Sequence, residues 1–222
     1  MSRLLSAAAI AVALTLSSFP VLAGGWARIA STGEEMKLEY RGARLRMSVG
    51  GQGEDAYMLI RDGKIYSVSG DMVIDAGSMM QAFGGQTKTP GDSLARFHAL
   101  EATGRSETVA GISGEVHVLD FTDHDGRRQQ KDVVLSEDDR VVALQEAFLR
   151  MTKTMAEATG TDTGGAADLE AALDGRGVLR MGNEMRVTEI SGETPAAERF
   201  ALPSEPKSMG DFGGDFGGAF GR

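Results

Sequence analysis

Alternation of apolar and polar positions predicts short β-strands over residues 34–75. Apolar side chains take every second position, with charged or polar residues between them, at Met36, Leu38 and Tyr40 and again at Leu45, Met47 and Val49. This period of two places one face of each strand in the core and leaves the other in water. Residues 57–61 and 64–69 continue the series, and the Asp62-Gly63 pair between them suits the positive φ angles of a tight hairpin turn. The first part of the chain is therefore expected to form an antiparallel sheet.

More strands are expected in the rest of the chain, at residues 72–74, 107–109, 115–121, 129–135, 178–181, 185–190 and 199–202. A turn at His124-Asp125-Gly126 joins two of them. Because the predicted strands outnumber the predicted helices, the sheet is the scaffold on which the helices pack. We interpret residues 26–207 as a single α+β domain.

One strong helix is predicted over residues 138–159. Its apolar residues recur every three or four positions, at Val141, Leu144, Phe148, Met151 and Met155. Gly160 ends this pattern, and Ser136 with Asp139 resembles a capping box at its start. Shorter segments are expected at residues 78–83 (a helix), 94–100 (a short amphipathic helix or turn) and 166–173 (a helix).

Residues 1–23 are typical of a secretory signal peptide. Arg3 precedes an apolar stretch too short to span a bilayer, and small residues end it at Ala23. Cleavage there would leave about 200 residues, enough for one domain with a real core. The chain has no cysteine, so it has neither a disulfide nor the lipid-modified cysteine of a lipoprotein. We expect a monomer without a stable membrane anchor, in the periplasm of a Gram-negative bacterium or secreted.

Charge and composition narrow the possible partners. The net charge of −9 argues against nucleic acid and against anionic membrane surfaces. Residues 208–222 repeat phenylalanine at 212, 216 and 220 among glycines and aspartates, so we expect them to be disordered. We interpret this segment as a solubilising tail, with its aromatic residues available as weak contact points.

A family resemblance covers residues 104–203. The run GRSETVAGISGEVH, from Gly104 to His117, is followed by the segments VLRM (178–181), MRVTEI (185–190) and RFALP (199–203). Together they resemble the exported bacterial domain of unknown function 4412. That family often has a cysteine near the position of Gly114 and an aromatic residue at that of His117, so any role of the cysteine is absent here.

The order of elements also resembles the lipoprotein-carrier fold. This resemblance implies a strongly curved antiparallel sheet that half-closes into a barrel, covered by one long and a few short helices. It further implies a hydrophobic ligand cleft between the sheet and the helices.

Catalytic and metal-binding signatures are weak. His98, His117 and His124 have no metal-ligand spacing, and the aspartates around residues 120–125 lie at a predicted turn, where aspartate serves backbone geometry. The chain has neither a nucleophile motif nor a glycine loop that precedes a helix and could hold phosphate. We therefore expect a non-catalytic protein with no cofactor and no metal.

Methionine supplies the remaining functional signal, with 12 in the chain. Its pliable thioether suits a core or a groove that adapts to apolar partners, and exported methionine clusters can also bind Cu(I). The expected function is binding or carriage of a lipid or acyl chain. The alternatives are an envelope protein-interaction or stress-sensing module without a small ligand, and a copper-binding protein. The predicted ligand site is lined by Met79, Met80, Phe83, Phe148 and Met151.

Overall fold

The computed structural model describes residues 24–50, 55–82, 94–160 and 165–208. The predicted signal peptide, Phe83 and almost all of the C-terminal tail lie outside these ranges. The strands are β1 (Gly24–Ser31), β2 (Glu34–Arg41), β3 (Arg44–Val49), β4 (Ala56–Arg61), β5 (Lys64–Ser69), β6 (Met72–Asp75), β7 (Leu94–Val109), β8 (Ile112–Asp123), β9 (Arg128–Ser136), β10 (Gly177–Met181) and β11 (Met185–Ser191). The helices are α1 (Ala76–Ala82), α2 (Asp139–Thr159), α3 (Ala166–Leu173) and the 3₁₀ helix η1 (Ala197–Phe200).

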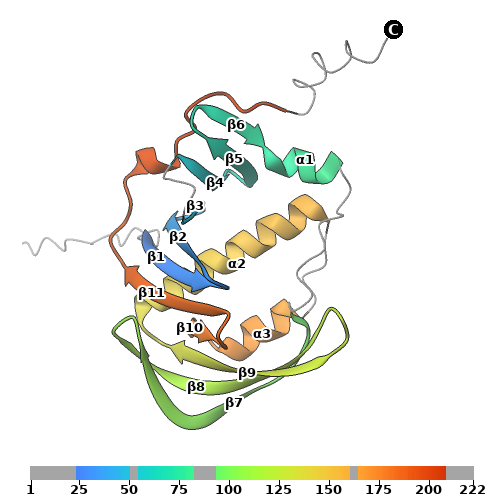
Figure 1. Cartoon of the computed structure of the whole chain (residues 1–222), viewed down its shortest axis with the longest axis vertical. Coiled ribbons are helices and arrows are strands. Elements are labelled where there is room, and N and C mark those ends of the chain that lie inside the picture. The colour runs from blue at the N-terminus through green and yellow to red at the C-terminus, as the bar shows by residue number, and fades with distance from the viewer. Residues whose placement is uncertain (1–23, 51–54, 83–93, 161–164, 209–222) are drawn as a thin grey trace, which may run out of the picture.

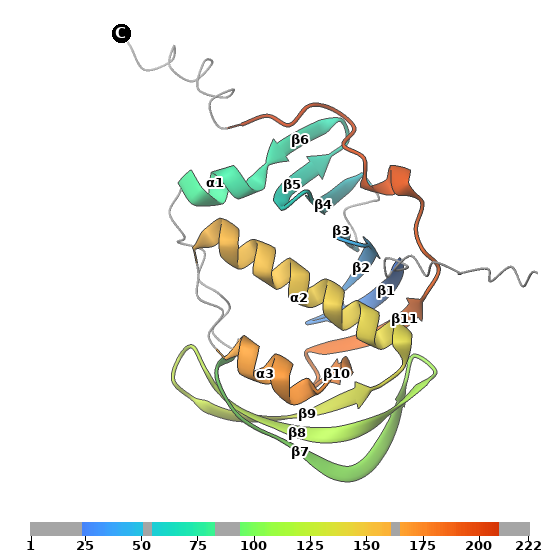
Figure 2. The same cartoon turned by 180° about the vertical axis from the view of Figure 1, so that it is seen from behind.

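All eleven strands join one antiparallel sheet in the order β6-β5-β4-β3-β2-β1-β11-β10-β9-β8-β7. The sheet is open, with β6 and β7 at its edges, and it is curved (Figure 1). Figure 2 shows α2 crossing the strands on the concave side and α3 lying in the bend formed by β7, β8 and β9. The predicted antiparallel sheet with helices packed on it is confirmed at this level.

Local sequence signals explain several element boundaries. Asp62 and Gly63 have φ angles of 54° and 73°, which confirms the predicted turn between β4 and β5. Helix α2 ends at Gly160 with φ of 66°, and α3 has the predicted bounds. The predicted capping box is wrong, because the side chain of Asp138, and not that of Ser136, accepts a hydrogen bond from the backbone N–H of Arg140 at 3.0 Å.

Strand β7 replaces the helix or turn predicted at residues 94–100. Leu94, Phe97 and Leu100 are three residues apart, which suggested a helix, yet they pair with every second residue of β8, namely Asp123, Phe121 and Leu119. The first two of three register shifts in β7 each insert one extra residue, so all three apolar side chains reach the face covered by α3. Sequence alone shows the spacing of three but not the bulges that produce it.

The C-terminal segment, residues 192–207, crosses the convex face of the sheet instead of forming the strand predicted at 199–202. Phe200, in η1, is fully buried against Leu59, Val68 and Val73. At its end, the backbone N–H of Lys207 donates to Val73 O at 2.9 Å, and the N–H of Asp75 donates to Lys207 O at 3.1 Å. This short parallel bridge fixes the end of the segment to the edge strand β6.

A buried charge network lies under this segment. Glu39 accepts hydrogen bonds from Arg46 at 2.9 Å and from Arg199 at 2.6 Å, and the Arg46 guanidinium stacks on Tyr57. Alternation predicted that this face of β2 and β3 is exposed, but Glu39 and Arg46 are buried because the C-terminal segment covers them. The C-terminal segment therefore covers the part of the convex face that holds Glu39 and Arg46.

Candidate ligand-binding surface

Helix α2 rests on a row of cross-strand neighbours on the concave face, here called the covered row. Tyr40 of β2 pairs with Leu45, Leu45 with Ile60, and Ile60 with Ile65 of β5, so all four side chains share one face. All four are buried. Burial raises the pKa of Tyr40 to about 12, and its hydroxyl donates to Arg140 O at 3.4 Å.

The space between α2 and the covered row is almost filled. It measures about 10 Å³ and is lined in part by Ala147, Met151 and Thr154 of α2. Such a volume holds one water molecule at most. The described side chains therefore leave no apolar cavity under this part of α2 that could hold an acyl chain.

The next row of the same face is open to solvent over part of its length. Met47 pairs with Met58, Met58 with Ser67, and Ser67 with Ile74 of the edge strand β6. Ser67 is exposed and the other three are half-buried. We call this set, Met47, Met58, Ser67 and Ile74, the open row. No charged side chain belongs to it.

Exposed apolar surface continues from the open row to the edge of the sheet. Met72 lies two residues before Ile74 on β6, so the two side chains share a face. Met72 is 50% exposed and is the one large apolar side chain classed as exposed in the described part of the chain. One exposed apolar side chain is ordinary, but Met72 extends the apolar side chains of the open row, and contiguous apolar surface marks contact sites.

Methionines form much of the half-buried border of the main core. Six of them pack against it while keeping part of their surface accessible, namely Met36, Met47, Met58, Met151, Met155 and Met185. They come from β2, β3, β4, α2 and β11. The junction of the concave face with α2 is thus lined by unbranched side chains that change shape at low cost.

The predicted site residues fall partly in this region. Phe148 and Met151 of α2 are half-buried and pack against the main core. Met79 and Met80 are half-buried on α1, a helix that contacts α2. Phe83 lies outside the described residues. Met47 and Met58 were not predicted as candidate site residues from the sequence, because their alternation with polar residues is typical of the core. Only the tertiary fold shows that α2 covers the covered row and leaves the open row partly exposed to solvent.

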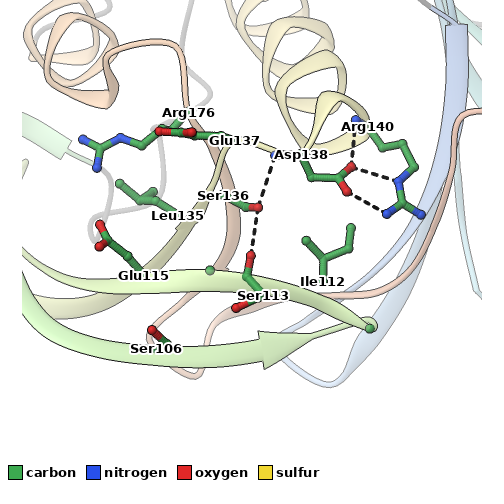
Figure 3. Close-up of a pocket in the computed structure, with 12 residues that line it drawn as sticks. Ser106, Ile112, Ser113, Glu115, Leu135, Ser136, Glu137, Asp138, Arg140 and Arg176 are labelled. Carbon is green, nitrogen blue, oxygen red and sulfur yellow. Dashed lines mark hydrogen bonds and ion pairs between the residues drawn. The ribbon is translucent and has the colours of Figure 1, made fainter.

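A second, polar pocket of about 620 Å³ lies beside the start of α2 (Figure 3). Four of its lining residues, Ser113, Ser136, Asp138 and Arg140, bind one another. Asp138 is held by Arg140 at 2.7 Å, and Ser136 Oγ donates to Ser113 O at 3.0 Å while accepting from the Asp138 N–H at 3.3 Å. These contacts use the polar groups for the pocket's own structure. They pair no nucleophile with a base.

His117 stands beside this pocket and is buried. Its Nε2 lies 3.0 Å from Nη1 of Arg176, which lines the pocket, and its Nδ1 lies 3.3 Å from Glu115 O. A neutral ring with its proton on Nδ1 satisfies both contacts, since arginine can only donate. Arg176 also donates to Leu173 O at 2.9 Å. His117 therefore helps fix the end of α3.

Asp123 serves backbone geometry at the β8–β9 turn, as predicted, whereas Asp120 binds the side chains of Arg128 and Gln130. Asp123 accepts hydrogen bonds from the backbone N–H groups of Asp125 and Arg127, both at 2.9 Å. Hydrogen bonds from Arg128 and then Gln130 lower the pKa of Asp120 to about 2. Over the described ranges, no group of three or more histidine, aspartate or glutamate side chains could hold a metal ion. None of the helices described is long and apolar enough to cross a membrane.

Comparison with known proteins adds no assignment. No protein-family model, curated protein or solved structure matches this chain. The functional interpretation therefore rests on the geometry of the concave face.

Proposed function

We propose that this protein is an exported, non-catalytic carrier or binding protein for an apolar ligand, such as a lipid or an acyl chain. The ligand lies on the open row and against the half-buried methionines beside α2. The observation that carries the proposal is the row of half-buried apolar side chains at Met47, Met58 and Ile74, which continues to the exposed Met72 at the edge of the sheet.

The apolar side chains of the open row indicate which class of ligand it would bind. With no charge in the open row, binding depends on burial of apolar surface, so its affinity is insensitive to salt. At about 0.8 kcal/mol for each buried methylene, micromolar binding needs on the order of ten or more methylenes. This favours a long alkyl chain over a small apolar solute.

The fold we propose is that of lipoprotein carriers, a strongly curved sheet that half-closes into a barrel with one long and a few short helices on its concave side. The open edges at β6 and β7 and the position of α2 support it. The signal peptide predicted at residues 1–23 supports export to the periplasm or the medium. A monomer with no stable membrane anchor fits a carrier that takes up and releases its ligand.

Two other functions have some support. The nearly filled space under α2 favours a protein-interaction or stress-sensing module without a small ligand. The direct cross-strand pairing of Met47 with Met58 would suit two thioether ligands of Cu(I). Native mass spectrometry of protein purified from its own host separates the three, because a carrier retains lipid, a copper protein retains copper, and an interaction module retains neither.

Titration with a fluorescent fatty acid tests the proposed surface directly. Met72→Asp places a charge at an exposed position, so the protein should stay folded while affinity falls about tenfold or more. Met58→Gln keeps the side-chain length and should also weaken binding. Asn183→Asp, which adds a charge on the exposed β10–β11 turn, is the matched control and should bind like the wild type. Equal binding by all four proteins would refute the proposed surface.

A further inference from the structure

The end of the described chain lies in the same cross-strand row as the proposed ligand surface. Lys207 is bridged to Ile74, and Ile74 is followed across the sheet by Ser67, Met58 and Met47. Lys207 is thus the next backbone position outward from the open row. The chain that follows it starts at the uncovered edge of that row.

The following residues carry the side chains that such a surface binds. Residues 208–222 read SMGDFGGDFGGAFGR, with phenylalanine at 212, 216 and 220 separated by glycines and other small or acidic residues. Phenylalanine rings make favourable contacts with methionine sulfur, and the open row contains two methionines. Glycines on both sides let a chain lie close to a sheet.

The residues that follow Lys207 are numerous enough to reach across the open row. Neighbouring strands are about 4.8 Å apart, so Met58 lies three strand spacings, or about 14 Å, from Lys207. Phe212 is five residues beyond Lys207 and reaches at most about 17 Å. Phe216, nine residues beyond, reaches about 30 Å and so passes Met47.

We propose that the C-terminal residues 209–222 dock their phenylalanines on the open row and are displaced when the apolar ligand binds. This inference rests on the proposed function, because it assigns a regulator to the same surface. Tethering at Lys207 gives the phenylalanines a local concentration in the millimolar range, so weak contacts suffice to occupy the row. The ligand must compete with them, which lowers its apparent affinity.

Methionine-methyl NMR of the full mature chain tests the docking without any ligand. The variant Phe212→Ser/Phe216→Ser/Phe220→Ser removes the rings, and Asp211→Asn/Asp215→Asn is the control that keeps them. Ring currents should shift the methyl signals of Met47 and Met58 in the wild type and the control relative to the serine variant. Met185, on β11, serves as the internal reference. Identical Met47 and Met58 signals in all three proteins would overturn the proposal.

Titration of the same three proteins with the fluorescent fatty acid tests the competition. The serine variant should bind about two- to tenfold more tightly than the wild type and the control. Equal affinities would overturn the competition while leaving the proposed function intact. Docking signals without probe binding in any protein would instead refute the proposed function, and with it the displacement, while leaving the docking itself supported. Methyl shifts that vanish on dilution would show that the tail of a second copy occupies the row, which contradicts docking within one chain.

Discussion

Loss of the charge on Glu39 should destabilise the protein more than loss of any exposed carboxylate. Glu39 is buried and accepts hydrogen bonds from Arg46, itself buried, and from Arg199, with Lys37 Nζ 3.5 Å away. Removing one partner of a buried ion pair leaves an uncompensated charge and costs about 3–5 kcal/mol. Because Arg199 is partly exposed and can turn to water, we expect Glu39→Gln to cost about 3 kcal/mol, the lower end of this range.

Urea unfolding followed by circular dichroism measures this loss of unfolding free energy. In thermal unfolding, a loss of about 3 kcal/mol should lower the Tm of a chain of this size by about 6–12 °C. The matched control is Glu189→Gln, whose carboxylate binds Arg28 on the exposed surface at 3.1 Å and should cost less than about 1 kcal/mol. Equal stability of the two variants would refute the inference that the C-terminal segment closes this face over a buried charge.

The same network predicts a pH dependence. Burial raises the pKa of the Glu39 carboxyl, but hydrogen bonds from Arg199 and Arg46 outweigh burial, so this pKa lies below its usual range. A lowered pKa in the folded state means that the stabilisation is fully present above the usual glutamate pKa of about 4.3 and is lost as the pH falls below it. The stability difference between wild type and Glu39→Gln should therefore shrink below about pH 4.

Three further changes test other parts of the structure. Leu144→Ala should cost about 3 kcal/mol in urea unfolding and Phe148→Ala about half as much, because Leu144 is buried and Phe148 only half-buried; the reverse order would contradict the orientation of α2. Gly114→Ala should cost about 1–3 kcal/mol in the same assay, since a Cβ there would lie 2.6 Å from a backbone oxygen of β9. Arg128→Ala should raise the pKa of Asp120 from about 2 toward the ordinary aspartate pKa of about 3.9, measured by carboxyl NMR.

Sequence patterns predicted the elements whose signals are local. The β4–β5 hairpin needs only the positive φ angles of two adjacent residues, and α2 ends where Gly160 adopts the left-handed conformation. Strand β1 was missed because its apolar and polar residues follow a stretch interpreted as a signal peptide. The bulged β7 was missed because a bulge depends on the partner strand, which the spacing of Leu94, Phe97 and Leu100 does not reveal.

The candidate site was harder to predict than the strands and helices, because residue type does not show which side chains on the concave face α2 covers. The helical spacing of Met151 places it on the face of α2 that packs on the core, whereas Met47 and Met58 alternate like the buried Leu45 and Ile60. Whether such a side chain is covered depends on which row α2 crosses, and that is a tertiary property. The burial of Arg46 has the same origin, because the segment that covers it follows about 150 residues later in the chain.

The two faces of the β1–β6 half of the sheet are linked through the C-terminal segment. On the convex face, Arg199 and Phe200 anchor that segment to Glu39 and to the small core under it. On the edge strand β6, Lys207 then brings the chain to the border of the concave open row. Contacts that close one face therefore fix where the phenylalanine repeat begins on the other. Weakening the anchor, as in Glu39→Gln, should loosen the tether, lower the local concentration of the phenylalanines at the open row and so strengthen binding of an apolar probe even as it destabilises the fold.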